Sequence, residues 1–271
     1  MRIFLLRHLV LGFSFLACIG CASVETVHVD IDASPKEDPK QASVLEKTLG
    51  ENGYYYLLLN YKLVDDVPQI HRLQKLGTRL THYSERPEIE YKYLIIDSKY
   101  HTAFSFPDGY IVFSTAMLNS LASDEKILCV LAHEIAHITH RHGVYFYEAK
   151  FGLNKSEVTG ERAFSLATQL GYNRAFELQA DQTALRYLYR AGLDPQTFID
   201  SLRQLEHFEK EDESLYQDDV KAGILKENRK NDLLERLSYP HLQNRIVYCQ
   251  NILPEIKQTE KVLYNPNDFQ F

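Results

Sequence analysis

The sequence predicts an α+β fold that is mostly helical, with a small β-sheet beside a histidine-rich helix. Its 271 residues are 45% hydrophobic and 25% charged, which suffices for one sizeable core. Helical periodicity recurs along the chain, and two short runs of aromatic and β-branched residues precede the histidines. We expect a signal peptide over residues 1–20, a lipid-anchor site and flexible tether over 21–46, and one folded domain over 47–271.

The N-terminal segment predicts an exported protein. Arg2 and Arg7 precede an apolar run from Leu9 to Ile19, which is too short to span a bilayer but suits a secretory signal. The run ends in CIGCAS, which resembles the lipobox of bacterial lipoproteins with Cys21 as the acylated residue, although Cys18 stands where such motifs usually carry Leu. Cleavage after Ala22 is the alternative. We therefore expect a lipoprotein on the periplasmic side of the bacterial outer membrane, or otherwise a soluble periplasmic protein.

Composition restricts the partners and the redox chemistry. A formal charge of -7 and a pI near 5.9, without a cluster of Lys and Arg, argue against nucleic acid as a partner. After Cys21 the chain contains only Cys129 and Cys249, which could pair in an oxidising compartment. Two cysteines so far apart in sequence do not define a disulfide framework, so we expect two buried thiols.

One helix and two strands are expected before the histidine cluster. Leu73, Leu76 and Leu80 follow a helical period that begins near Val67, and a proline at the next position suits a first turn. Segments 90–96 and 109–113 are rich in aromatic and β-branched residues, and a Pro-Asp-Gly turn signal precedes the second. They predict the small sheet.

The histidines are expected on a helix. Ser123 is a suitable N-cap, and Lys126 to His142 contains neither Gly nor Pro until Gly143, where we expect the helix to end. A second long helix is expected over residues 163–191. The strongly charged segment 206–236 predicts solvent-exposed helices around a loop near residue 223.

The segment LAHEIAHITHRH, residues 131–142, has the spacing of a metal site. His133 and His137 are four residues apart, so both imidazoles project from one helix face and can reach one ion. Glu134 lies one step around the helix, where it can act as a general base toward water. The flanking residues are apolar nearly all round, which predicts that both histidines are buried and need a partner. His140 and His142 are expected to be solvated or to support the ligands indirectly.

A catalytic zinc ion takes three protein ligands, so a third ligand must come from another segment. The segment NRAFELQAD, residues 173–181, is similar to the E-x-E-A-D motif of the HtpX/BepA-like zinc metallopeptidases, gluzincin-type relatives of the CAAX-prenyl endopeptidases. The resemblance implies a zincin-like fold, one Zn²⁺ per chain and Glu177 as the third ligand. It places Asp181 one helical turn later, where it can accept the other N–H of a ligand imidazole. The second acidic position of the motif is Gln179 here.

Two further stretches extend this resemblance over roughly residues 67–250. AFSFPDGYIVFSTAML, residues 103–118, resembles the strand and turn before the zinc helix, and SYPHLQNRI, residues 238–246, resembles a late H-P-x4-R segment. Tyr239 stands where relatives usually have His, and His241 lies close by. Either side chain could face the cleft and stabilise an oxyanion, or simply pack in the fold. Arg245 is expected to pair with an acidic neighbour.

Together these features predict a zinc-dependent endopeptidase of the bacterial cell envelope that acts on misfolded or unassembled envelope proteins. The strand near residues 109–113 is expected to offer its edge to an extended substrate. The alternative is a chaperone-like zinc-containing lipoprotein that binds or escorts outer-membrane proteins with little proteolysis. A structural zinc site that includes Cys129 is disfavoured, because no other sulfur donor is near. Glu134 favours the endopeptidase, since a pure binding protein has no evident need for a base beside the metal.

Overall fold

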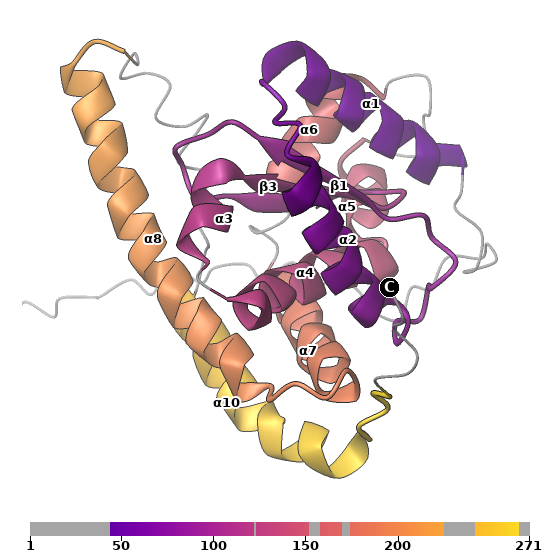
Figure 1. Ribbon diagram of the computed structural model, residues 1–271. Helices are drawn as coiled ribbons and strands as arrows, with labels where there is room; N and C mark the ends of the chain where they lie inside the picture. The colour runs from indigo at the N-terminus through magenta and orange to yellow at the C-terminus, as the bar shows by residue number, and fades with distance from the viewer. Residues whose placement is uncertain (1–43, 122, 152–157, 170–173, 225–241, 266–271) are drawn as a thin grey trace, which may run out of the picture. The chain divides into compact units, whose positions relative to one another are not determined.

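A computed structural model describes residues 44–121, 123–151, 158–169, 174–224 and 242–265 (Figure 1). These residues confirm the α+β class, with many helices around one three-stranded sheet. In chain order the elements are α1 (Val44–Asn60), α2 (Val67–Thr81), β1 (Lys92–Ile96), β2 (Ala103–Phe106), β3 (Tyr110–Ser114), α3 (Thr115–Ser120), α4 (Asp124–Thr139), α5 (His142–Phe151), α6 (Gly160–Gln169), α7 (Arg174–Arg190), α8 (Gln196–Lys221) and α10 (Leu242–Thr259).

The sheet has the order β1-β3-β2, with β1 parallel and β2 antiparallel to β3. The two expected strands correspond to β1 and β3, and β2 is a third strand within the stretch thought to contain one strand and a turn. Asp108 and Gly109 both have positive φ and form the tight turn that joins β2 to β3. The strand expected to offer its edge, β3, is paired on both sides, so that expectation was wrong and β2 is the edge strand nearer the histidine helix.

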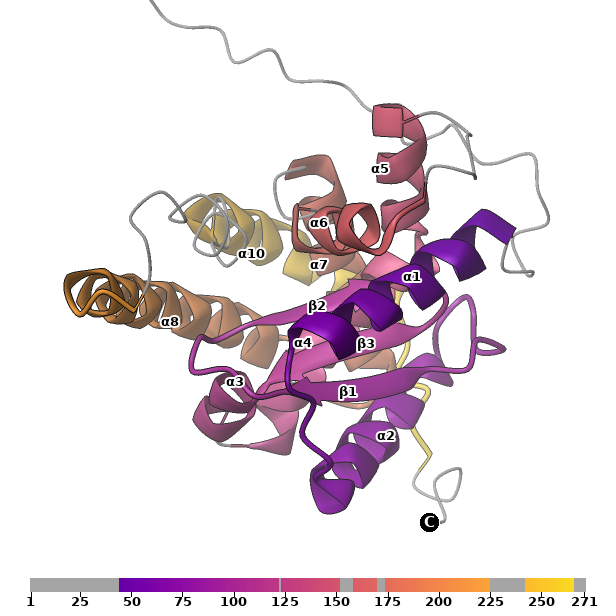
Figure 2. The same cartoon turned by 90° about the horizontal axis from the view of Figure 1, so that it is seen from above.

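Side chains of the sheet alternate between two helical layers. Phe104 and Phe106 pack with α1 and α6, whereas Ile111 and Phe113 belong to the larger core that contains α2, α4, α7, α8 and α10. Figure 2 shows α1 and α2 on opposite sides of the sheet. Ser105, between the two phenylalanines, therefore points to the side occupied by α4.

Helix α4 runs through the interior of the domain. It packs along α7, and it also contacts α2, α8 and β2. Its residues from Ile127 to Ala132 are all buried, which confirms the sequence-based expectation of a helix that is apolar nearly all round. Ser123 accepts a hydrogen bond from the backbone N–H of Lys126 and so caps the helix as expected.

The end of α4 differs from the expectation. The helix stops at Thr139 because Arg141 takes a positive φ of 57°, and α5 begins at His142. Gly143 therefore lies inside α5 and does not end the histidine helix. A Cβ at Gly143 would come within 2.9 Å of the Pro107 ring, so the glycine permits close contact between α5 and the turn after β2.

The later helices also differ in detail from the expected ones. The long helix expected over residues 163–191 is two helices, α6 and α7, with undescribed residues between them. Helix α8 ends at Lys221, before the expected loop near Gly223, but the rest of the charged segment lies outside the described residues. Cys129 and Cys249 are both buried free thiols, as expected.

The folded part begins earlier than residue 47. Helix α1 starts at Val44, and Glu46 in its first turn is completely buried against Arg86, with an Nη1 to Oε1 distance of 2.8 Å. Arg141 lies 3.3 Å from the same carboxylate and is itself buried. Helix α1 thus starts three residues before the expected boundary at residue 47, and Glu46 helps to compensate two buried guanidinium groups.

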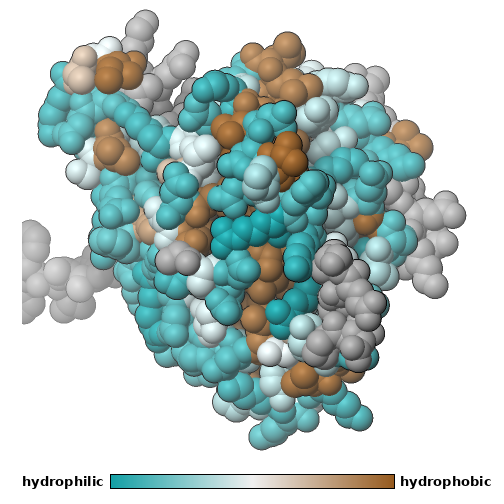
Figure 3. Space-filling model, viewed as in Figure 1, coloured by the Kyte–Doolittle hydropathy of each residue, from teal (hydrophilic) through white to brown (hydrophobic). Residues whose placement is uncertain are grey.

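Apolar side chains reach the surface over part of α1. Tyr55, Leu58 and Leu59 are exposed on this helix, and Figure 3 shows hydrophobic residues gathered there. Within the described ranges, no helix combines the length and hydrophobicity that crossing a bilayer requires.

We predict that Glu46→Ala lowers the free energy of unfolding by about 3–5 kcal/mol, because it leaves the buried guanidinium of Arg86 without this carboxylate. Urea denaturation followed by circular dichroism would measure the change. Glu51→Ala, on the exposed face of the same helix, is the matched control and should change stability by less than about 0.5 kcal/mol. Equal effects of the two substitutions would contradict the structural role of Glu46.

Candidate metal centre

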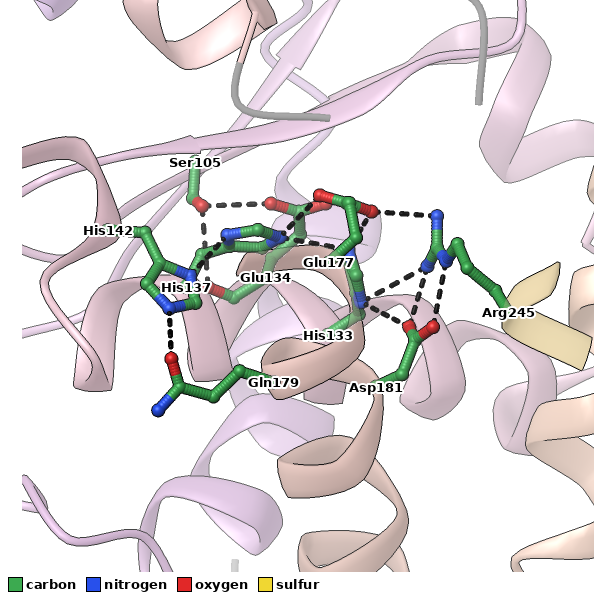
Figure 4. A network of polar contacts seen from close by, with 9 residues as sticks. All are labelled: Ser105, His133, Glu134, His137, His142, Glu177, Gln179, Asp181 and Arg245. Atoms are coloured by element: carbon green, nitrogen blue, oxygen red, sulfur yellow. Dashed lines mark hydrogen bonds and ion pairs between the residues drawn. The ribbon is translucent and has the colours of Figure 1, made fainter. Parts of the chain in front are cut away.

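Three side chains from two helices converge on one point. His133 and His137 project one turn apart from α4, and Glu177 projects from the first turn of α7 (Figure 4). One ligand atom from each residue lies within 4.8 Å of the others. The structure thus brings together the two histidines predicted from the motif and the glutamate implied by the resemblance, across 40 residues of sequence.

The donor atoms suit a divalent cation. The two Nε2 atoms are 3.0 Å apart, and the Glu177 carboxylate lies 3.4 Å from His133 Nε2 and 3.2 Å from His137 Nε2. All three side chains are largely buried, so two imidazole nitrogens that face each other need a shared cation or proton. Two histidines and one glutamate are a known ligand set of catalytic zinc sites, and the residues present therefore fit a zinc ion.

The Nδ1 atom of His133 faces away from this point toward Asp181. Asp181 lies one turn after Glu177 on α7, is completely buried, and places Oδ1 3.0 Å from His133 Nδ1. Arg245 of α10 holds both carboxylates: Nη1 lies 2.7 Å from Glu177, while Nη2 and Nε donate to the two oxygens of Asp181 at 2.6 and 2.8 Å. Three helices are therefore joined by one buried set of charges.

These contacts shift the pKa values of the buried acids and of one histidine. Burial raises the pKa of Glu177, but Arg245 and His133 outweigh burial and hold it well below its usual value. Burial likewise raises the pKa of Asp181, and Arg245 and His133 bring it below its usual value. Burial is the largest single effect and lowers the pKa of His133, but the charge of Glu177 and the hydrogen bonds to Asp181 and Glu177 together raise it to about 9. The metal-free site thus keeps a proton where a cation would bind.

Glu134 lies beside the three candidate ligands and points to the sheet. Its Oε2 accepts a hydrogen bond of 2.8 Å from the hydroxyl of Ser105 on β2, and Figure 4 shows its carboxylate next to the ligand cluster. Glu134 is itself buried, at 7% exposed. A carboxylate in this place can remove a proton from water at the metal position.

The Nδ1 atom of His137 has a different partner from that of His133. It lies 2.9 Å from Nδ1 of His142, and Nε2 of His142 lies 3.0 Å from Oε1 of Gln179. His142 was expected to support the ligands or to be solvated, and it supports a ligand. His140 contacts the hydroxyl of Thr183 at 2.7 Å and is not one of the candidate ligands.

The other predicted site residues fall outside the part of the chain that the structure describes. Tyr239, His241 and Cys21 belong to this group, so their expected roles stay predictions. The sequence alone did not identify two residues that support the site, Ser105 and Gln179. Ser105 has no signal beyond its place in a strand, and Gln179 was noted only as a departure from a motif.

Comparison with known proteins agrees with this geometry. Residues 69–252 match peptidase family M48. This chain belongs to that family. The match contains α4, α7 and the start of α10, so all the candidate ligands and their supporting residues lie within it. The resemblance to the HtpX/BepA-like metallopeptidases is thereby confirmed.

Curated relatives include the beta-barrel assembly-enhancing protease of Escherichia coli, 23% identical over 52% of this chain and 34% of that protein. The mitochondrial metalloendopeptidase OMA1 of Arabidopsis thaliana is 28% identical over 40% of this chain and 24% of its own length. Its namesake from Saccharomyces cerevisiae is 31% identical over 40% and 34%, respectively. The alignments thus span about a third or less of these relatives.

We predict that lowering the pH weakens zinc binding well above the ordinary titration range of histidine. Because the pKa of His133 is raised to about 9 in the metal-free protein, a proton competes with the cation below that pH. Apparent zinc affinity should fall about tenfold for each pH unit below 9 and level off above it. Competition with a chelating dye between pH 6 and 10 would measure this. An affinity that declines only below pH 6.5 would contradict the shift.

Proposed function

We propose that this member of family M48 is a zinc-dependent endopeptidase of the bacterial cell envelope. The observation that carries the proposal is the Glu134 carboxylate, held by Ser105 next to His133, His137 and Glu177. Metal ligands alone would equally suit a protein that stores metal or a metal site that only stabilises the fold. A base beside three metal ligands is the arrangement that hydrolysis of a peptide bond needs.

The residues divide the chemistry between them. His133, His137 and Glu177 would hold the ion, which would supply Lewis acidity toward the scissile carbonyl and toward water. Glu134 takes the proton of the attacking water and delivers it to the leaving amine. The Ser105 hydroxyl donates to one oxygen of that carboxylate, which leaves the other oxygen to meet the water.

The edge strand β2 is suited to bind an extended peptide. The backbone N–H of Ser114 donates to the carbonyl oxygen of Thr102, so the hydrogen-bonded pairs of the ladder are 102, 104 and 106 with 114, 112 and 110. Ala103 and Ser105 therefore direct their backbone N–H and C=O groups away from β3. A substrate strand added there would pass Ser105 and hence the base Glu134.

This mode of binding supports unfolded proteins as the substrate class. Strand addition reads the backbone of an extended chain, which misfolded and unassembled proteins expose and folded ones hide. The expected export signal with Cys21 directs the proposal to envelope proteins and to anchoring by lipid on the outer membrane. The name of the Escherichia coli relative, a beta-barrel assembly-enhancing protease, agrees with that setting.

The competing function is a chaperone-like lipoprotein that binds outer-membrane proteins and seldom cuts them. Such a chaperone-like protein would use the same edge strand and the same zinc site to bind its partners. Glu134 distinguishes the two functions, because the escort needs the metal and the strand but not the base.

We predict that Glu134→Gln abolishes cleavage and retains binding. The substitution preserves size and removes basicity, so turnover of an unfolded outer-membrane protein should fall by about a hundredfold or more, while zinc content stays at one per chain. The substituted protein should then retain the substrate that the wild type cuts. Gel-based cleavage, metal analysis and pull-down of the substrate would measure the three quantities.

His137→Ala is the matched control for this experiment, since it removes a candidate ligand from the same helix and should lose both zinc and cleavage. Cleavage by zinc-loaded Glu134→Gln at the wild-type rate would refute the mechanism. Substrate binding with no cleavage by the wild type would favour the escort function.

We also predict that Cys21→Ser releases the protein from the membrane. The thiol of Cys21 is the proposed attachment point, and acyl chains stabilise membrane binding by about 0.8 kcal/mol per buried methylene. Fractionation of cells that express either form should find the substituted protein in the soluble fraction. Cys18→Ser is the control and should stay in the membrane fraction. Retention of Cys21→Ser would indicate another anchor.

A further inference from the structure

The two candidate histidine ligands are supported by different kinds of partner. His133 directs Nδ1 to the charged carboxylate of Asp181 at 3.0 Å, whereas His137 directs Nδ1 to a second imidazole, that of His142, at 2.9 Å. His142 in turn reaches the neutral amide of Gln179 at 3.0 Å (Figure 4). We call His133–Asp181 the first arm and His137–His142–Gln179 the second arm. The second arm ends at an amide and therefore carries no formal charge at its end.

The amide oxygen of Gln179, at the end of the second arm, determines which atom donates in each hydrogen bond of that arm. An amide oxygen only accepts, so Nε2 of His142 donates its proton to Oε1 of Gln179. The Nδ1 atom of neutral His142 is then an acceptor, and the proton of the Nδ1–Nδ1 contact belongs to His137. Nε2 of His137 is left with its lone pair facing the Nε2 atom of His133.

We propose that His142 and Gln179 are positioning residues that hold His137 as the Nδ1–H tautomer, with Nε2 ready to bind the metal. Neutral histidine in water prefers the opposite tautomer, with the proton on Nε2, which cannot bind a metal through that atom. The chain of hydrogen bonds from His137 through His142 to Gln179 reverses this preference. The proposal depends on the metal centre and not on cleavage.

Packing fixes the ring of His142 in the orientation that this chain requires. The ring is 1% exposed and stacks on Phe176 with a centroid distance of 4.3 Å and an interplanar angle of 14°. His140 also stacks on this ring, at 5.4 Å and 16°. A buried ring that stacks on two other rings can only tilt a little, so Nδ1 and Nε2 keep their separate partners.

The two arms should therefore differ in how strongly each makes its histidine donate an electron pair to the metal. The Asp181 carboxylate accepts a charge-assisted hydrogen bond from His133 and makes this imidazole a more basic metal ligand. His137 gains less from the neutral arm. Replacing Gln179 by Glu would place a carboxylate at the end of the second arm and make the two arms alike.

Three substitutions test this inference by zinc affinity, measured with a chelating competitor at fixed pH. His142→Phe keeps an aromatic ring in the stack and removes both nitrogens, so affinity should fall by about 10–100-fold. Gln179→Leu keeps both imidazoles and should weaken binding by about tenfold. Gln179→Glu should tighten binding. His207→Gln, which replaces an exposed histidine of α8 that pairs with Glu211, is the control and should leave affinity unchanged.

A second measurement reports the tautomer directly. In zinc-free protein labelled with ¹⁵N-histidine, the spectrum should show His137 protonated at Nδ1 in the wild type and at Nε2 in His142→Phe. If His142→Phe does not fold, Gln179→Leu supports the same comparison. Wild-type affinity in His142→Phe and Gln179→Leu, or an unchanged tautomer, would overturn the proposal. Neither measurement needs cleavage, so a zinc-loaded protein that cuts nothing would refute the proposed endopeptidase and leave this inference standing.

Discussion

The structure depends on the pairing of buried charges between α4, α7 and α10. Glu177 and Asp181 stand one turn apart on α7, and a single guanidinium, that of Arg245, satisfies both. An unpaired carboxylate in this interior would cost several kcal/mol, so the three helices can pack only in an arrangement that keeps Arg245 between them. The same arrangement turns Glu177 toward the two histidines and Asp181 toward Nδ1 of His133. The contacts that compensate the buried charges are therefore the same contacts that place the candidate ligands.

The sheet adds a separate constraint through Ser105. Because side chains alternate along β2, the two neighbouring phenylalanines pack on the side of α1 and α6 while Ser105 meets α4. Its hydroxyl binds the side chain of Glu134, and its backbone N–H and C=O face away from β3. One residue thereby links the base of the proposed reaction to the strand proposed to bind substrate. A shift of β2 by one residue would break both relations.

Several features of the fold were decided by interactions between distant segments. The break after α4 occurs at Arg141, whose buried guanidinium meets Glu46 of α1, and no local signal in the sequence marks this position. Gly143, which has the local signal of a helix end, continues into α5 because it lies against Pro107. Pairing of β3 on both sides likewise reflects the position of β2, a short strand next to a turn. Local propensity is a weak guide where long-range contacts compete with it.

The sequence by itself determined the class of the fold, the histidine helix and the pair His133 and His137, because a spacing of four residues fixes two side chains on one helix face. Resemblance to a motif supplied Glu177 and Asp181, which spacing alone cannot assign. Only the tertiary structure decided that Arg245 joins both acids, that Ser105 holds Glu134, and that His142 and Gln179 support His137. These partners come from separate elements, and their contacts depend on how helices and strands pack in three dimensions. A periodic pattern records which face of an element is buried, but it does not record which residue of another element will meet it.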